Sequence, residues 1–394
     1  MTDKDNSFDA LAPETFDSPY RSYAELLSRC PVAHSPSWGG FWALLSYDEV
    51  TRAAADYRTF ITSRQNVIPK VAFTGRRPPL HFDPPDHTPY RQALNPLLRE
   101  ERTADLEPVI RGSARRHIAE MVARGEGDLC ADMSSHLPID TFAAWMNIDG
   151  RQAEALTEAG RAYNIAVQGA EEELVKTTSL KLYGMATDLI RRRREAPMDP
   201  DRDFTSALLA ARVGGEPLPE EMIVGTIRQV LVVGIIAPTV IIGSIGVHLA
   251  RDQALQRRLR AEPALIPAAT EEFLRLYTPY RGFARTAVAE VEIAGCPIPA
   301  DEPIALIYAS ANRDPARFPD PHSFVLDRPN IAEHVAFGRG PHHCPGAALG
   351  RMEIRVAIEE LLAGTAHFEL SAEPKQTRFP EIGALSVPLR LTQA

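Results

Sequence analysis

In several long stretches of the chain, apolar residues recur at spacings of three and four with charged residues between them. This spacing places the apolar side chains on one face of an α-helix. It predicts helices over Asp105–Arg124, Arg151–Ala170 and Glu171–Arg194. Runs typical of strands are shorter and fewer, at residues 39–47, 291–310 and 384–392. The pattern therefore predicts a mainly α fold with a small β portion.

A longer apolar segment follows Pro219 and predicts one helix over Glu220–Asp252. Its centre, residues 230–245, carries no charge, and only small residues, Pro238 and Thr239 interrupt it. A membrane span is the alternative interpretation. The interruptions, the marginal apolar length and the lack of a second such segment favour a buried central helix.

Composition narrows the class of protein. The chain has 394 residues, 44% of them hydrophobic and 24% charged, and shows no repeat. No linker divides it, so we expect one domain over residues 1–394. The polar, acidic start lacks the features of a signal peptide, which predicts a cytoplasmic protein without a membrane partner. The net charge of −9 argues against general nucleic-acid binding. Four cysteines in unlike contexts predict thiols rather than disulfides.

The stretch FGRGPHHCPG, residues 337–346, comes directly before a helical run. Its glycines permit positive φ and Pro341 fixes its own φ, so a tight loop is predicted before Cys344. Cys344 then lies at the N-terminus of a helix. Backbone amides and the helix dipole favour the thiolate there, which is the form that binds metals or attacks electrophiles.

Three uses of that thiolate are considered. A structural zinc site needs a second, distant pair of ligands, because His342 and His343 lie too close to Cys344 to complete it. A nucleophilic cysteine with a histidine base is possible, although nothing else in the chain favours acyl transfer. The third use is the axial ligand of a haem iron.

Phe337, Gly340, Cys344 and Gly346 match the pattern Phe-x-x-Gly-x-x-x-Cys-x-Gly, and the stretch resembles the haem-binding loop of the cytochrome P-450 family. The resemblance implies haem b with Cys344 as the iron ligand and with Phe337, Gly338 and Gly346 beside the cofactor. It also implies the family's fold, in which the haem lies between the central helix and the helix that follows the cysteine.

The resemblance extends to residues that hold the haem propionates. The stretch HFDPPDHTPYR places His87 and Arg91 where the family has a histidine and an arginine that reach them. Their i, i+4 spacing puts both side chains on one helix face. Arg285 and His342 are similarly placed by the resemblance.

A further match, EEFLR, resembles a Glu-x-x-Arg pair of the family and gives Glu272 and Arg275. The resemblance implies that this pair is structural and bridges to Arg328 or its neighbours. Taken together, the matches follow the family's order from about residue 31 to residue 391.

The central helix departs from the family's pattern, small-Gly-x-Asp/Glu-Thr. An ungapped alignment puts Gly234, Ile235, Ala237 and Pro238 at the small residue, the glycine, the acid and the threonine, and Thr239 follows. The acid is therefore missing, and the alcohol is missing or displaced by one residue.

An internal proline frees the carbonyl of Gly234 and predicts a kink. Two roles then remain open for this stretch. In the first, Gly234, Ala237, Pro238 and Thr239 form a catalytic group in which a water on the freed carbonyl and the Thr239 hydroxyl deliver protons. In the second, Pro238 merely bends a core helix and Thr239 caps the defect.

The residues and the resemblance together predict a haem-thiolate monooxygenase that inserts one atom of dioxygen into a small to medium hydrophobic or aromatic substrate. Electrons are expected from a separate ferredoxin or reductase, because the chain carries no flavin or iron–sulfur domain. The alternatives are a hydrogen-peroxide-dependent peroxygenase, a non-oxygenating haem enzyme, and a haem-binding sensor without turnover.

Two larger sets of residues complete these expectations. The substrate contacts implied by the resemblance are Val71, Phe73, Tyr163, Val233, Ile236, Ala237, Gly282, Phe283 and the turn from Ile382 to Leu385. A basic docking face for an acidic redox partner is one interpretation of a scattered set of arginines, and ordinary solvated arginines are the other: Arg99, Arg102, Arg111, Arg115, Arg339, Arg351 and Arg355.

Overall fold

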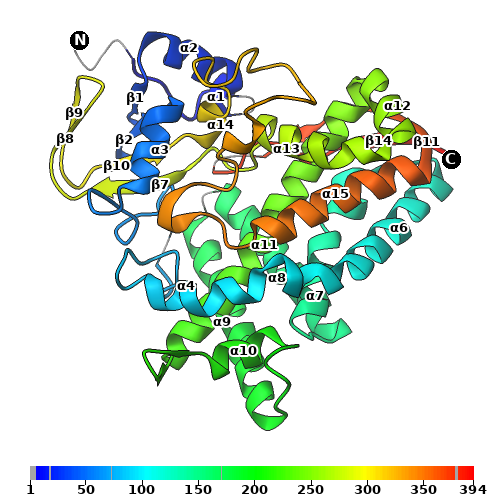
Figure 1. The fold of residues 1–394 in the computed structure, drawn as a ribbon, viewed down its shortest axis with the longest axis horizontal. Coiled ribbons are helices and arrows are strands. Elements are labelled where there is room, and N and C mark those ends of the chain that lie inside the picture. Colours follow the sequence, from blue (N-terminus) through cyan, green and yellow to red (C-terminus); the bar gives the residue numbers. More distant parts are fainter. Residues whose placement is uncertain (1–5, 17–18, 72, 170, 378–379) are drawn as a thin grey trace.

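Most of the long helices lie away from the main sheet, whereas β11 and β14 lie beside α12 among the helices (Figure 1). The computed structural model describes residues 6–16, 19–71, 73–169, 171–377 and 380–394. Its helices are α1 Pro13–Phe16, α2 Tyr20–Arg29, α3 Tyr47–Ala55, α4 Thr88–Leu94, α5 Glu100–Thr103, α6 Glu107–Arg124, α7 Leu137–Trp145, α8 Gly150–Gln168, α9 Glu172–Glu195, α10 Phe204–Ala210, α11 Glu220–Arg251, α12 Gln253–Ala261, α13 Ile266–Leu276, α14 Tyr308–Ala311 and α15 Ala347–Gly364.

The strands are short and most pair with neighbours that are close in sequence. They are β1 Val32–Ser35, β2 Phe41–Leu44, β3 Phe60–Ile61, β4 Glu126–Asp128, β5 Arg212–Val213, β6 Glu216–Pro217, β7 Phe283–Ala287, β8 Val291–Ile293, β9 Cys296–Ile298, β10 Pro303–Leu306, β11 Thr365–Leu370, β12 Lys375–Gln376, β13 Ala384–Ser386 and β14 Pro388–Gln393. The main sheet has the order β1-β2-β10-β7-β3, in which β10 and β2 are parallel and the other pairs antiparallel.

The predicted helices are present with small shifts at their ends. The segment Asp105–Arg124 corresponds to α6, and Arg151–Ala170 and Glu171–Arg194 correspond to α8 and α9. The predicted end at Ala170 lies outside the described residues. A capping box explains where α8 begins, because the Asp149 carboxylate accepts a hydrogen bond from the backbone amide of Gln152. The mainly α prediction is confirmed.

The central helix α11 lies inside the helical part and packs against α7, α8, α9 and α15 (Figure 1). Within it, 78% of the most apolar 18-residue window is buried, so the buried-helix interpretation holds over the membrane span. It runs as one α-helix through Pro238, and the expected kink does not interrupt it.

Glycines of α11 allow its neighbours to approach closely. A Cβ at Gly234 would overlap the Phe142 ring of α7, and one at Gly243 would lie 2.5 Å from the Cys130 sulfur. The small residues that interrupt the apolar run are thus contact points for packing.

A buried ion-pair group fixes the segment that leads to the cysteine loop. Glu272 accepts hydrogen bonds from Arg275 at 2.8 Å and from Arg328 at 3.1 Å, and these side chains are nearly inaccessible to solvent. Arg275 also donates to the carbonyl oxygens of Asn312 and Pro321. Because each charge has several partners, the group ties α13 to the chain before the loop.

A second buried acid, Glu353 of α15, has much less compensation. Its side chain is 2% exposed and its Oε1 atom has no hydrogen-bond partner. Burial raises the pKa of this carboxyl group to about 8, and a hydrogen bond with Thr141 of α7 opposes the rise. The group therefore favours its neutral form in the folded protein at neutral pH.

This shift predicts a pH-dependent loss of stability. The folded pKa lies above the unfolded one, so the folded state holds a proton that the unfolded state releases, and the free energy of unfolding falls as pH rises from about 4.5 to about 8. Each pH unit inside that window costs about 1.4 kcal/mol at most. Urea unfolding at pH 5.5 and 7.5 should show this fall in the wild type and a shallower one in Glu353→Gln. Glu154→Gln, at an exposed position of α8, is the control. Equal slopes in the wild type and Glu353→Gln would contradict the assignment.

Candidate functional site

The loop before Cys344 is held by glycine conformations and by one backbone hydrogen bond. Gly338 and Gly340 have φ of +69° and +71°, and a Cβ at Gly340 would collide with the backbone of α3 at Ala54. The Cys344 amide donates to the Phe337 carbonyl oxygen at 2.8 Å. The helix α15 begins at Ala347, shortly after the cysteine, as the sequence predicts.

The sulfur of Cys344 lies among donors and cations. Burial raises the pKa of the Cys344 thiol, whereas a hydrogen bond from the Gly346 backbone amide and the charges of Arg91 and Arg351 lower it. Amides and arginines directed at a sulfur stabilise its thiolate once a metal takes the place of the proton. Cys344 keeps part of its side chain accessible in the protein alone.

Four residues expected at the propionates come together beside the cysteine loop. The His87 and His342 rings lie 4.5 Å apart between centroids. Arg91 of α4 donates to the His343 carbonyl oxygen at 2.8 Å. Arg285 of β7 is 2% exposed, and its charge lowers the pKa of His342.

Positive charge dominates this group. Burial, followed by the charge of Arg91, lowers the pKa of His87 to about 4. Burial, followed by the charge of Arg285, lowers the pKa of His342 to about 2. Asp83 faces the group at 3.9 Å from His342 Nε2.

A haem fits these residues. The buried Nε2 atom of His87 has no hydrogen-bond partner, and the charge of Asp83 acts on Arg285 and His87. Two propionate groups would supply the missing acceptors and negative charge, while the Cys344 sulfur supplies an axial ligand. A thiol with cationic side chains nearby is the set of groups that a haem with two propionates requires.

In the middle of α11, Val233 is 37% exposed and Ala237 is partly exposed. Their spacing of four residues places them on one face of the helix. That face is available to a molecule in the interior, in agreement with the substrate contact expected at Val233.

Thr239 points away from that face. Its hydroxyl donates to the carbonyl oxygens of Ile235 at 2.8 Å and Ser134 at 3.0 Å, and the Ser134 hydroxyl donates to the Thr239 carbonyl oxygen at 3.1 Å. These bonds occupy the Thr239 hydroxyl, and neither acceptor is the Gly234 carbonyl oxygen that Pro238 frees. Both roles left open by the sequence stay predictions. The catalytic roles of Gly234, Ala237 and Pro238 stay predictions.

The other expected substrate contacts differ in their surroundings. Phe73 is 70% exposed and stacks on His81, and Leu385 of β13 is also exposed. Tyr163 and Ile236 are buried, and Val71 is partly buried against the core of the helical part. The expected contacts therefore do not form one continuous lining in the protein alone.

Sequence reasoning missed Tyr280, which precedes β7. Its ring centroid lies 5.2 Å from that of Phe283. Burial raises the pKa of Tyr280 well above its usual value, and Glu381, Tyr163 and Cys344 add to the rise. Tyr280 is thus within electrostatic reach of both the cysteine and Tyr163. In the sequence, the available signal was a tyrosine between the EEFLR stretch and Arg285.

It also missed Arg77 and Arg228, which are 7% and 1% exposed. The signal was available for Arg228, because it is a lone cation inside the apolar helix α11. A buried charge in such a helix needs a partner and therefore marks a site.

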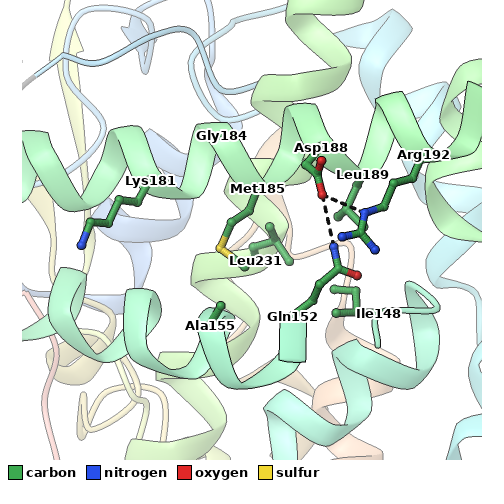
Figure 2. A pocket seen from close by; sticks show the side chains of 10 residues that line it. All are labelled: Ile148, Gln152, Ala155, Lys181, Gly184, Met185, Asp188, Leu189, Arg192 and Leu231. Carbon is green, nitrogen blue, oxygen red and sulfur yellow. Dashed lines mark hydrogen bonds and ion pairs between the residues drawn. The ribbon is translucent and has the colours of Figure 1, made fainter. Parts of the chain in front are cut away.

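Two surface cavities lie away from the Cys344 sulfur. The first, of about 390 Å³, lies between α8 and α9, where Gln152 and Arg192 both contact Asp188 (Figure 2). The second, of about 550 Å³, is lined by residues of 61–90, including Asp83, and by Pro219 and Met222. The second therefore borders the propionate group.

Most arginines of the expected docking face are engaged in ion pairs. Arg111, Arg115 and Arg355 pair with glutamates of α6 and α15, and Arg351 pairs with Glu271. Glutamates of α6, α13 and α15 therefore offset the positive charge at these four positions. The docking face stays a prediction.

The described residues contain no group of three or more His, Cys, Asp or Glu side chains that could hold a metal ion. The zinc alternative considered from the sequence thus has no such ligand set within them.

Comparisons with known proteins agree with this geometry. A family profile described as Cytochrome P-450 matches residues 171–391. The mycinamicin IV hydroxylase/epoxidase of Micromonospora griseorubida is 31% identical over 381 residues, with 94% of each chain covered. The linalool 8-monooxygenase of Pseudomonas putida is 28% identical, with 91% of this chain and 92% of that protein covered.

Solved structures give the same result for the fold. The structure of cytochrome P-450 CYP109Q5 from Chondromyces apiculatus superposes with a TM-score of 0.89 at 27% identity, and covers 98% of this chain and 99% of that one. The match extends over nearly the whole length of both chains, with the cysteine loop inside it. The chain therefore belongs to the cytochrome P-450 family of haem-thiolate oxidoreductases and has that family's fold.

Proposed function

We propose that this protein is a haem b monooxygenase in which Cys344 is the axial iron ligand. The observation that carries the proposal is the surroundings of the Cys344 sulfur. This sulfur accepts a hydrogen bond from the Gly346 backbone amide and lies near the charges of Arg91 and Arg351. When bound, a thiolate-ligated haem supplies the activation of dioxygen, because electron donation by sulfur favours cleavage of the O–O bond.

The chain's own residues hold and shield the cofactor. His87, Arg91, Arg285 and His342 bind the propionates by charge-assisted hydrogen bonds. Phe337, Gly338 and Gly346 let the backbone pass close to the porphyrin, as the resemblance implies. The apolar face of α11 around Val233 excludes water from the opposite side.

Proton delivery is the step at which this chain departs from its family. No carboxylate stands at Ala237, and the Thr239 hydroxyl is occupied by two carbonyl oxygens. We infer that protons come from water or substrate. These same observations favour the second candidate, a peroxygenase, since hydrogen peroxide brings its own protons. A sensor without turnover is the third.

The substrate is a small to medium organic molecule that meets Val233, Tyr163 and Phe283. The relatives named for mycinamicin IV and linalool act on organic molecules of different size. We also propose that a separate ferredoxin or reductase delivers the electrons. We further propose one catalytic domain over residues 1–394 and a cytoplasmic location.

The assignment of the iron ligand predicts a spectroscopic result. The ferrous carbonyl complex of the wild type should absorb at the long-wavelength position of thiolate haems, and Cys344→His should lose that band while it retains haem. Cys30→Ser, a change at a partly exposed cysteine outside the loop, is the control and should keep the band. Persistence of the band in Cys344→His would show that another residue holds the iron.

The proposed reaction is tested with labelled oxygen. With NADH, a surrogate ferredoxin and its reductase, and monoterpene alcohols, alkylbenzenes and arylcarboxylic acids as probes, ¹⁸O₂ should place one ¹⁸O atom in the product. Label that enters only from H₂¹⁸O₂, without NADH, would identify a peroxygenase. Absence of label in the product from both ¹⁸O₂ and H₂¹⁸O₂ would contradict both the monooxygenase and the peroxygenase.

The inference on protons is checked in the same assay. Because the Thr239 hydroxyl is bonded to carbonyl oxygens, Thr239→Ala should leave the ratio of product to NADH nearly unchanged. Ala237→Asp combined with Pro238→Thr supplies the family's acid and alcohol and should raise that ratio. If Thr239→Ala instead diverts electrons from NADH to hydrogen peroxide, the Thr239 hydroxyl takes part in proton delivery.

A further inference from the structure

A second group of buried cationic side chains lies outside the propionate group. It consists of Arg77 and His81, which follow the segment at Phe73, and Arg228 of α11, with Tyr163 of α8 between them. Their side chains are 7%, 8% and 1% exposed in the order Arg77, His81 and Arg228. We call these four residues the arginine site.

Arg228 has fewer partners than a buried guanidinium group needs. Its Nη2 donates to the Ser179 hydroxyl of α9 at 2.8 Å. Its Nε and Nη1 atoms are buried and have no hydrogen-bond partner. The Arg228 Cζ atom lies 4.7 Å from the centroid of the Tyr163 ring and 5.7 Å from that of Tyr183. These aromatic faces offset only part of the cost of burying a charge.

Arg77 brings a second positive charge to the same place. Gly225 of α11 makes this possible, because a Cβ there would collide with the Arg76 carbonyl group. The Arg77 guanidinium interacts with the Tyr163 phenol, and its Nε atom is buried without a partner. Burial, followed by the charge of Arg228, lowers the pKa of Arg77.

His81 does not compensate these charges. Burial, followed by the charges of Arg77 and Arg228, lowers the pKa of its imidazole to about 3, so the ring is neutral at pH 7. Its Nε2 atom is buried and unpartnered. Among the described residues, no Asp or Glu forms an ion pair with Arg77 or Arg228. Two like charges without an anion are costly in an interior, and an anion from outside removes that cost.

The arginine site lies beside the first part of α11. Val233 and Ala237 follow Arg228 by five and nine residues, which places them about 7.5 Å and about 13.5 Å farther along the helix axis and about 140° and about 180° around it. The arginine site therefore lies on another side of α11 than Val233 and Ala237. Tyr163 interacts with the arginines and lies within reach of Tyr280, which is also within reach of Cys344. A molecule held at one end by the arginines thus reaches toward the cysteine past Tyr163 and Tyr280.

We propose that the arginine site binds the carboxylate group of the substrate, so that the substrates of this enzyme are small to medium aromatic or aliphatic carboxylic acids. This inference rests on the proposed function as a haem monooxygenase and names the substrate class. A carboxylate suits two guanidinium groups because it accepts paired hydrogen bonds in one plane. Tyr163 then contacts the apolar remainder.

The test compares an acid with a neutral molecule of the same shape. Isothermal titration calorimetry of the haem-loaded protein measures binding of biphenyl-4-carboxylate and of biphenyl-4-carboxamide, without turnover. The acid should bind about tenfold more tightly or better, because hydrogen bonds to charged groups are worth more than neutral ones. Arg228→Gln and Arg77→Gln should each remove that difference and leave amide binding unchanged.

Matched controls separate the charge from the fold. Arg76→Gln, at the exposed neighbouring position, should keep the preference for the acid. Arg228→Lys retains the charge and should keep part of it, even if Arg228→Gln fails to fold. Equal affinity of the wild-type protein for acid and amide would overturn the proposal. A protein that binds chloride but does not bind biphenyl-4-carboxylate would also overturn the proposal, since the site would then hold an inorganic anion only.

The two proposals fail in different ways. Loss of the thiolate carbonyl band or of ¹⁸O incorporation from ¹⁸O₂ would overturn the proposed function and leave the calorimetric preference in place. Absence of the preference, with the band and the oxygen label as expected, would overturn the substrate class alone.

Discussion

Buried positive charge that the chain does not neutralise is the constraint on which the interior of this protein depends. Arg285 lies within reach of one carboxylate, Asp83, near the cysteine loop, and no Asp or Glu of the described residues forms an ion pair with Arg77 or Arg228. Elsewhere the chain supplies its own anions, as in the group of Glu272 with its arginines. A buried arginine without a carboxylate partner is costly unless a ligand supplies the negative charge.

The two cationic groups have different tasks in this account. The group beside Cys344 requires a dianion at a fixed distance from a thiol, which corresponds to a haem with two propionates. The arginine site requires one anion. Tyr163 and Tyr280 lie between the two groups, since Tyr163 interacts with the arginines and Tyr280 is within reach of both Tyr163 and Cys344. Cofactor and substrate then complete the electrostatics of the fold.

Local sequence pattern was sufficient for some features and insufficient for others. The helices, the loop before Cys344 and the buried nature of α11 followed from periodicity and from glycine and proline chemistry. Short strands such as β3 and β4 carry little periodicity, and they pair with the distant strands β7 and β14. The neutralisation of Arg111 and Arg355 depends on how α6 meets α15, which no local pattern contains.

The candidate site divides in the same way. Cys344 and the propionate residues could be found because family resemblance supplies their order along the chain. The orientation of Thr239 could not, because it is decided by the Ser134 carbonyl group of a segment more than one hundred residues earlier. Arg77 reaches Arg228 only because Gly225 lets the segment at Arg76 lie against α11.

The central claim is that the cationic side chains beside Cys344 bind the carboxylates of a haem. Reconstitution of the haem-free protein with haem and with haem dimethyl ester, whose propionates carry no charge, tests it most directly. The account predicts that haem binds about tenfold more tightly or better than its ester, that Arg91→Ala and Arg285→Ala reduce this preference, and that Arg339→Ala, in the exposed part of the loop, does not. Equal affinity of the wild-type protein for haem and ester would contradict it.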